Sequence, residues 1–141
     1  MKFLYFCICF ALLAGVAFAK PSINEELEKN AEICTEQSHV TTEELDKFFA
    51  NGMQDVDATD PVKCHFKCIM EQNKFFVDGS LVPEEILKSL EGKELLKDRL
   101  DEMATVIATC NNEKGEHDCE GAYKLLKCID NTEVGKMAFA A

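Results

Sequence analysis

The sequence predicts an all-α domain in which six short helices pack as an irregular bundle and are stapled by disulfide bonds. Three observations lead to this expectation. The chain starts with an uncharged segment typical of exported proteins, the rest of it holds an even number of cysteines, and its apolar residues recur at helical spacing. With 141 residues, the chain suits a single domain. We find no convincing strand pattern.

The N-terminal segment has the features of a secretory signal peptide. Lys2 gives it a positive start, and residues 3–19 carry no charge and end in small side chains. A membrane anchor is the alternative, but the run falls short of the roughly 20 residues of a membrane span and contains Gly15. We therefore expect residues 1–19 to be removed and residues 20–141 to form one secreted, extracellular domain.

Removal of the signal peptide takes the cysteine count from eight to six, because Cys7 and Cys9 leave with it. Six cysteines in an exported domain indicate three disulfides rather than free thiols. They are Cys34, Cys64, Cys68, Cys110, Cys119 and Cys128. Cys64 and Cys68 lie one turn apart on a predicted helix, where a bridge between them would have poor geometry, so each is expected to reach a different partner. Spacing alone does not select among the possible pairings.

The charge balance is acidic. The formal net charge is −11, and loss of Lys2 with the signal peptide makes it one unit more negative. Nucleic acid and anionic membrane surfaces are bound by basic patches, so neither is expected as a partner.

Four of the predicted helices have start signals. Residues 22–25 and 41–44 have the spacing of a capping box. Asp60 stands before Pro61 as a capping residue, and Pro83 is followed by two glutamates.

Apolar residues give each predicted helix one face to bury. In chain order these faces run through residues 23–34, 45–49, 62–69, 86–90, 96–110 and 119–129. The fifth helix is the longest and starts at Leu96. The tail after Asp130 is apolar, but it is too short to be a core helix.

The gaps between the six cysteines are 29, 3, 41, 8 and 8 residues. This spacing resembles the six-cysteine pattern of insect odorant-binding proteins, the pheromone- and general-odorant-binding family. Residues 63–70 are similar to the family's third helix, Asp78 and Gly79 to the turn before its fourth, and residues 118–122 to the start of its sixth. The resemblance covers essentially all of residues 20–141, and five gaps that match together are a specific signal.

The resemblance implies six helices around an enclosed apolar cavity, with the disulfides Cys34–Cys68, Cys64–Cys119 and Cys110–Cys128. It implies a carrier, monomer or weak homodimer, that binds odorants, pheromones or other small hydrophobic molecules in extracellular fluid. The same resemblance implies delivery to a membrane odorant receptor in olfaction. It implies no cofactor. An alternative is a carrier of lipids, hormones or amines outside sensory tissue, because the lining rather than the scaffold selects the ligand.

A hydrophobic carrier needs a pocket lined by apolar and aromatic groups with few polar anchors. The candidate lining residues are Phe66, Ile69, Phe76, Leu81, Ile86, Met103, Ile107, Ala122, Tyr123 and Leu126. The methionine suits a pocket that accepts varied shapes, and the Tyr123 hydroxyl is a candidate contact for a polar ligand end. Each of these residues also has the simpler interpretation of ordinary core.

Two further hypotheses concern the tail and the histidines. The apolar tail around Phe139 is expected to form part of the pocket wall, and a frayed terminus is the alternative. His39, His65 and His117 suggest release of the ligand at acidic pH, with three exposed histidines and no switch as the simpler interpretation.

Other classes of protein fit less well. The step His117-Asp118-Cys119 is similar to one in secreted phospholipases A2, but their paired cysteines before it and their glycine-rich calcium loop are missing. Saposin-like proteins also carry six cysteines on helices, but their first two lie much closer together than Cys34 and Cys64. A metal site would require reduced thiols, which export disfavours. We therefore expect no catalytic residues and no metal.

Overall fold

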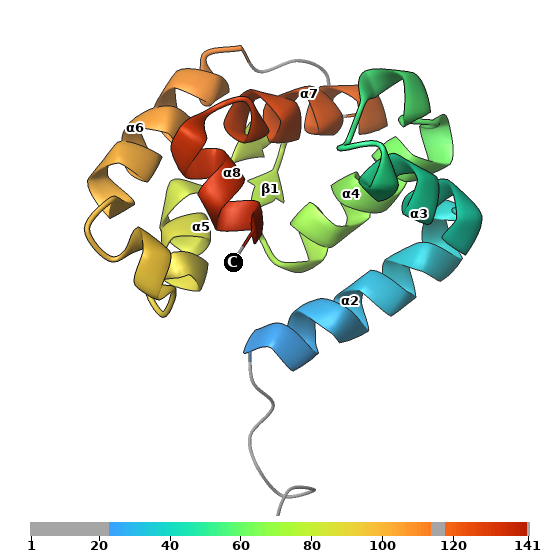
Figure 1. Cartoon of the computed structure of the whole chain (residues 1–141), viewed down its shortest axis with the longest axis horizontal. Helices are drawn as coiled ribbons and strands as arrows, with labels where there is room; N and C mark the ends of the chain where they lie inside the picture. Colours follow the sequence, from blue (N-terminus) through green and yellow to red (C-terminus); the bar gives the residue numbers. More distant parts are fainter. Residues whose placement is uncertain (1–22, 114–117, 141) are drawn as a thin grey trace, which may run out of the picture.

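The computed structural model describes residues 23–113 and 118–140, and within them the chain is mostly helical (Figure 1). The α-helices are α2 (Ile23–Ser38), α3 (Thr42–Ala50), α4 (Asp60–Gln72), α5 (Pro83–Leu90), α6 (Leu100–Asn111), α7 (Cys119–Asp130) and α8 (Glu133–Ala140). Two short 3-10 helices are η1 (Asp55–Asp57) and η2 (Glu94–Leu96). The predicted all-α class is confirmed, and the six expected helices correspond to α2 through α7. None of the helices described here is long and apolar enough to cross a membrane.

Hydrogen bonds at the helix starts agree with the sequence signals, with one shift. The capping box before α3 is present, because the backbone N–H of Glu44 donates to the Thr41 hydroxyl while the Glu44 carboxylate accepts from the Thr41 backbone. Before α4 the capping residue is Thr59 rather than Asp60, which is already the first helical residue. The Thr59 hydroxyl accepts from the backbone N–H of Val62 at 3.4 Å. Residue 22 lies outside the described residues.

The expected fifth helix is divided in the structure. Leu96 belongs to η2, and α6 begins only at Leu100 after a turn. Leu96 is nevertheless fully buried. The four-residue step from Leu96 to Leu100 fits a continuous helix, but it also fits a 3-10 turn followed by a helix. Periodicity alone therefore placed the helix start too early.

A small hairpin interrupts the helices, although no strand was expected. Strands β1 (Phe76–Val77) and β2 (Ser80–Leu81) pair antiparallel, with Phe76 opposite Leu81. Asp78 and Gly79 form the turn with positive φ angles of 50° and 78°, as a tight two-residue hairpin turn requires. Strands of two residues are too short for an alternating pattern to show in the sequence.

The helices pack around α4 and α7. Helix α4 packs against α2 on one side and against α7 on the other, while α5, α6 and α8 lie together at the far end (Figure 1). Most buried side chains form what we call the main core. Its buried members are Met70, Phe76, Leu81, Ile86, Leu90, Leu96, Met103, Ile107, Cys110, Ala122, Leu125, Leu126, Ile129, Val134 and Ala138. A smaller α3 core consists of Val40, Phe48, Ala58, Val62 and Tyr123.

The tail after Asp130 is a helix of the core, so the expectation that it is too short for this role is wrong. Helix α8 buries Val134 and Ala138 in the main core and packs against α6, α7 and η2. The Thr132 hydroxyl donates to the carbonyl oxygen of Ile129 and accepts from the backbone N–H of Gly135, which turns the chain back immediately after α7. A helix of eight residues is unstable alone, and here packing against three elements stabilises it.

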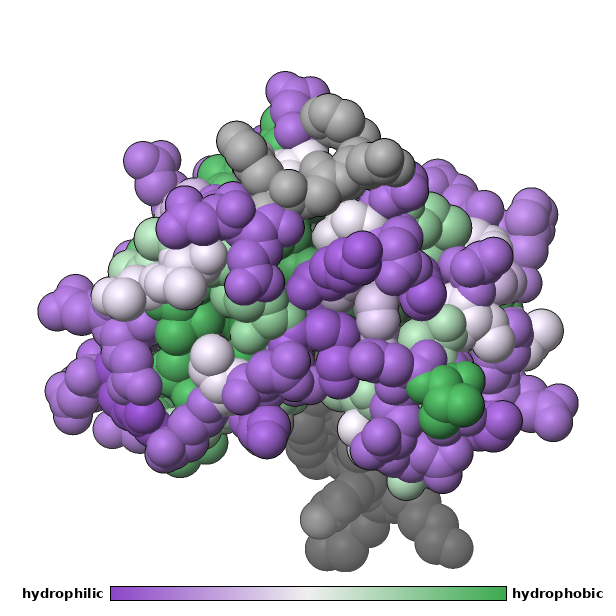
Figure 2. Space-filling model, turned by 90° about the horizontal axis from the view of Figure 1, so that it is seen from above, coloured by the Kyte–Doolittle hydropathy of each residue, from purple (hydrophilic) through white to green (hydrophobic). Residues whose placement is uncertain are grey.

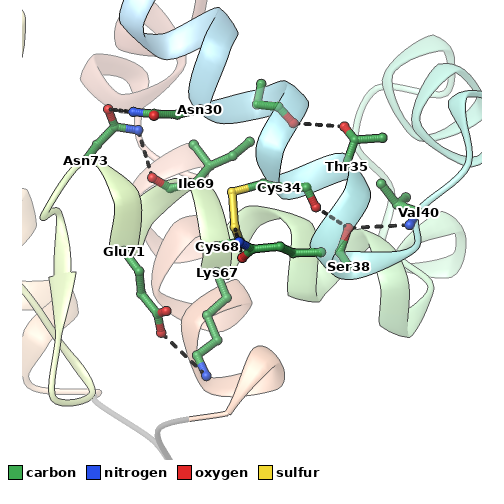
Figure 3. The surroundings of a disulfide bond; sticks show 12 residues. Asn30, Cys34, Thr35, Ser38, Val40, Lys67, Cys68, Ile69, Glu71 and Asn73 are labelled. Carbon is green, nitrogen blue, oxygen red and sulfur yellow. Dashed lines mark hydrogen bonds and ion pairs between the residues drawn. A yellow bond between two sulfur atoms is a disulfide. The ribbon is translucent and has the colours of Figure 1, made fainter.

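Three disulfides join the helices. Cys34–Cys68 connects α2 to α4, Cys64–Cys119 connects α4 to α7, and Cys110–Cys128 connects α6 to α7. These are the pairs that the family resemblance implies. Figure 3 shows the first, and near it the side-chain amide of Asn30 in α2 donates to Asn73 after α4 at 3.1 Å.

Candidate ligand-binding site

Most of the expected lining residues meet in the main core. Seven are buried there, and Phe66 packs against it from α4. The seven are Phe76, Leu81, Ile86, Met103, Ile107, Ala122 and Leu126. They come from β1, β2, α5, α6 and α7, so the fold brings together side chains that are far apart in the sequence.

Three expected lining residues lie elsewhere. Tyr123 belongs to the α3 core, and its hydroxyl donates to Asp55 in η1 at 2.9 Å. Ile69 is half-buried on the side of α4 that faces α2 (Figure 3) and is in neither core. Phe139 leaves 48 % of its surface exposed, while its neighbours in α8 supply the buried contacts.

The main core also holds residues that the sequence reasoning did not propose as lining. They are Met70, Leu90, Leu96, Cys110, Leu125, Ile129, Val134 and Ala138. Val134 and Ala138 lie four residues apart, which is the helical spacing that would have identified the tail as a helix. Met70 and Met103 are both buried in this core, and Met137 packs against it, so three flexible side chains border the same space.

Polar side chains tie the elements of the main core together at its edges. The Asn111 amide, at the end of α6, accepts from the Leu81 backbone N–H at 2.8 Å and donates to the Leu81 carbonyl oxygen at 2.9 Å. Asn111 thus pairs with β2 much as a third strand would, and it fixes Leu81 in the core. Lys93 donates to the carbonyl oxygen of Ala138 at 3.2 Å, which holds α8 against η2.

The three histidines lie in different environments. His65 in α4 is only 4 % exposed, and burial lowers its pKa, an effect that a hydrogen bond to the backbone of Cys34 partly opposes. His65 is therefore neutral at pH 7. His39 is exposed, and His117 lies outside the described residues.

The His-Asp-Cys step has structural roles where it is described. The Asp118 carboxylate caps α7 by accepting from the backbone N–H of Gly121 at 2.8 Å, and Cys119 is bonded to Cys64. In the part of the chain that the structure describes, no cluster of three histidine, cysteine or acidic side chains is arranged to hold a metal ion.

Large apolar side chains are exposed at separate positions of the described chain. Figure 2 shows a mostly hydrophilic face on which small hydrophobic areas are separated by polar side chains. Large exposed apolar residues include Phe49, Val56, Val77 and Leu95. The larger gathering of apolar groups in the described chain is the main core.

Comparison with known proteins agrees with this architecture. A sequence model of the PBP/GOBP family matches residues 16–132, a range that holds all six paired cysteines. A search of curated proteins found no significant match.

Two solved structures share the fold. An odorant-binding protein of Locusta migratoria is 24 % identical, with a TM-score of 0.64 over 86 % of this chain and 89 % of that one. A fatty acid binding protein from the oral disk of the blowfly Phormia regina is 20 % identical, with a TM-score of 0.61 over 84 % of this chain and 97 % of that one.

Proposed function

We propose that this chain, which belongs to the PBP/GOBP family and binds small hydrophobic molecules, is a secreted carrier that delivers odorants or pheromones to membrane receptors. The observation that supports this most is the family match, which extends over the three-disulfide helical scaffold. The family consists of binding proteins, and we propose no catalytic activity.

We propose that the ligand occupies the main core, between the hairpin and helices α5, α6 and α7. The gathering of aromatic, aliphatic and methionine side chains there supports this placement. The three methionines that border the core are able to change rotamer around ligands of different shape. Burial of apolar ligand surface would supply most of the affinity, at about 25 cal/mol per Å² before the entropic terms that oppose binding.

We propose that residues 1–19 direct export and are removed. The three disulfides are consistent with an extracellular protein, because such bonds persist in oxidising compartments. Expression in cultured insect cells and mass spectrometry of the medium would test this. A secreted chain that begins at Lys20 is expected, and retention of the intact chain in the cells would contradict it.

The binding proposal is tested by displacement of a fluorescent apolar probe from the secreted protein. Volatile alcohols are expected to displace the probe if the ligands are odorants. A second candidate function, transport of fatty acids, is suggested by the fold shared with the blowfly fatty acid binding protein. Displacement by long-chain acids and not by volatile alcohols would favour that function, and a probe that does not bind at all would contradict both.

Delivery needs a separate test. A cell line that expresses an odorant receptor, bathed in medium with or without the protein, should respond at lower total odorant concentration when the carrier is present. An unchanged response across all receptors of the sensory tissue would contradict delivery while leaving ligand binding intact.

A further inference from the structure

Helix α3 and η1 lie in a stretch of the chain that carries no disulfide. Residues 35–63 contain no cysteine, while Cys34 and Cys64 on either side of them are each held by a disulfide bond. The backbone contacts of α3 with the other described elements are sparse, and its main neighbour is η1. Helix α3 is therefore attached to the helices beside it chiefly by side chains.

Few of these side chains are apolar and buried. Of the nine residues of α3, all of which are described, only Phe48 is buried. The shorter helix α8, by comparison, buries both Val134 and Ala138 in the main core. Because elements with few buried apolar contacts open at a lower free energy than the core, α3 should open more easily than α8.

Helix α3 and η1 are nevertheless bound to each other. The Asp57 carboxylate in η1 accepts a hydrogen bond from the Asn51 amide at 2.7 Å and forms an ion pair with Lys47 of α3 at 3.0 Å. The two elements therefore form one unit, residues 41–57, which we call the α3 flap.

The far end of the α3 flap is held to α7 by two hydrogen bonds, which we call the latch. The Tyr123 hydroxyl donates to the Asp55 carboxylate at 2.9 Å, and the Lys127 ammonium group donates to the carbonyl oxygen of Met53 at 2.9 Å. The residues at the two ends of the flap, Val40 and Ala58, are buried in the α3 core. The flap can thus swing about its fixed ends once the latch is broken.

Phe66 of α4 lies beneath the α3 flap. The rings of Phe48 and Phe49 lie beside the Phe66 ring, at centroid distances of 5.6 and 6.1 Å. Among the described side chains, Phe66 is the one that packs against both the main core and the α3 core. Movement of the flap away from α4 would therefore uncover Phe66, and with it the side of the main core that Phe66 borders.

We propose that the α3 flap covers the entrance to the main core, and that the latch sets the rate at which ligands enter and leave. This inference rests on the proposed function and adds the route of the ligand to it. The latch is closed both before and after binding, so it slows entry and release by the same factor and leaves the affinity unchanged.

The test is stopped-flow fluorescence with the apolar probe N-phenyl-1-naphthylamine. In Tyr123→Phe the rate constants of association and dissociation should both rise about fivefold, the factor that corresponds to the loss of one hydrogen bond, while Kd stays the same. Lys127→Met removes the donor to the Met53 carbonyl oxygen and should likewise raise both rate constants.

Two variants outside the flap are the matched controls. Asn30→Ala removes the hydrogen bond to Asn73 that joins α2 to the end of α4, and Glu133→Gln weakens the contact with Arg99 that holds α8. Both should keep the wild-type rate constants. Unchanged rate constants in either latch variant, or faster ones in Glu133→Gln, would overturn the flap as the entrance and leave the carrier function standing. A probe that does not bind to the wild type would overturn both.

A measurement on the unmodified protein covers the case in which the latch variants do not fold. NMR relaxation dispersion should show exchange on the microsecond-to-millisecond timescale at Phe48 and Asp55 in the α3 flap and at Phe66 beneath it. Exchange that is confined to α8, or that is absent from the flap, would refute the inference.

Discussion

Gly135 is the position where a single methyl group should detach an element from the core. A Cβ atom built on Gly135 would lie 1.8 Å from the carbonyl oxygen of Ile129 and 2.6 Å from its carbonyl carbon. Both atoms are backbone at the end of α7 and cannot rotate away. In Gly135→Ala, therefore, α8 must move relative to α7.

The expected loss of stability follows from what α8 buries. Displacement would expose Val134 and Ala138 and break the hydrogen bond from Gly135 to the Thr132 hydroxyl. A buried valine contributes about 1.5–3 kcal/mol, and a methyl group about 0.8 kcal/mol. We expect unfolding in urea to show a loss of about 2–4 kcal/mol, although glycine to alanine in an open helix usually stabilises by about 0.5–1 kcal/mol.

Gly92→Ala is the control for this prediction. Nothing lies within 4 Å of a Cβ at Gly92, so that variant should be neutral or slightly stabilising. If Gly135→Ala unfolds within about 0.5 kcal/mol of Gly92→Ala, the close approach of α8 to α7 does not exist in solution and the argument fails.

Three further predictions concern stability and binding. Burial lowers the pKa of His65 below its value of 6.5 in the unfolded chain, so the contribution of the neutral imidazole to stability is complete above about pH 6.5 and is lost as the pH falls. The urea midpoints at neutral and mildly acid pH should therefore differ less in His65→Asn than in the wild type. An equal difference in the two proteins would refute this. Removal of residues 136–141 takes away the packing of Ala138 and the acceptor of Lys93, so the affinity for an apolar probe should fall several-fold, and unchanged affinity would contradict it. Tyr123→Phe removes the hydrogen bond to Asp55 and should lower the free energy of unfolding by about 1 kcal/mol without changing probe affinity, whereas a clear loss of probe affinity in this variant would show that the hydroxyl contacts the ligand.

The sequence predicted the helices that carry both a start signal and a full apolar face. Thr41 begins a capping box and Pro83 opens α5 as expected, because these signals act through neighbouring residues alone. Helix α8 was missed because its stability depends on contacts with distant elements. Two of these contacts are polar. Arg99, just before α6, forms an ion pair with Glu133 at 3.2 Å, and Lys93, just before η2, donates to the carbonyl oxygen of Ala138. The four-residue spacing of Val134 and Ala138 is a helical signal, but it does not reveal these distant partners.

The candidate site was predicted only in part, for a related reason. Helical periodicity identifies residues that are buried, but it does not say which buried faces meet. Phe76 and Leu81 were predicted to line the pocket as apolar residues, and the hairpin and Asn111 are what bring them into the main core. Ile69 has the same helical spacing as its neighbour Phe66, yet it lies toward α2, because the direction of each face depends on where the disulfides hold α4.

The roles of the two polar candidates follow from how the fold treats each of them. Tyr123 was a candidate for the ligand's polar contact, but its hydroxyl donates to Asp55 in η1. Burial, together with this hydrogen bond, raises the pKa of Tyr123. His65 looked like a titrating surface group because histidine usually is one, but two disulfides fix α4 on either side of it and bury the ring. Burial lowers the pKa of the imidazole, and its Nδ1 atom makes no hydrogen bond to any residue that the structure describes. The disulfide framework thus has a chemical consequence besides stability, because it holds a neutral imidazole buried between α4 and α2.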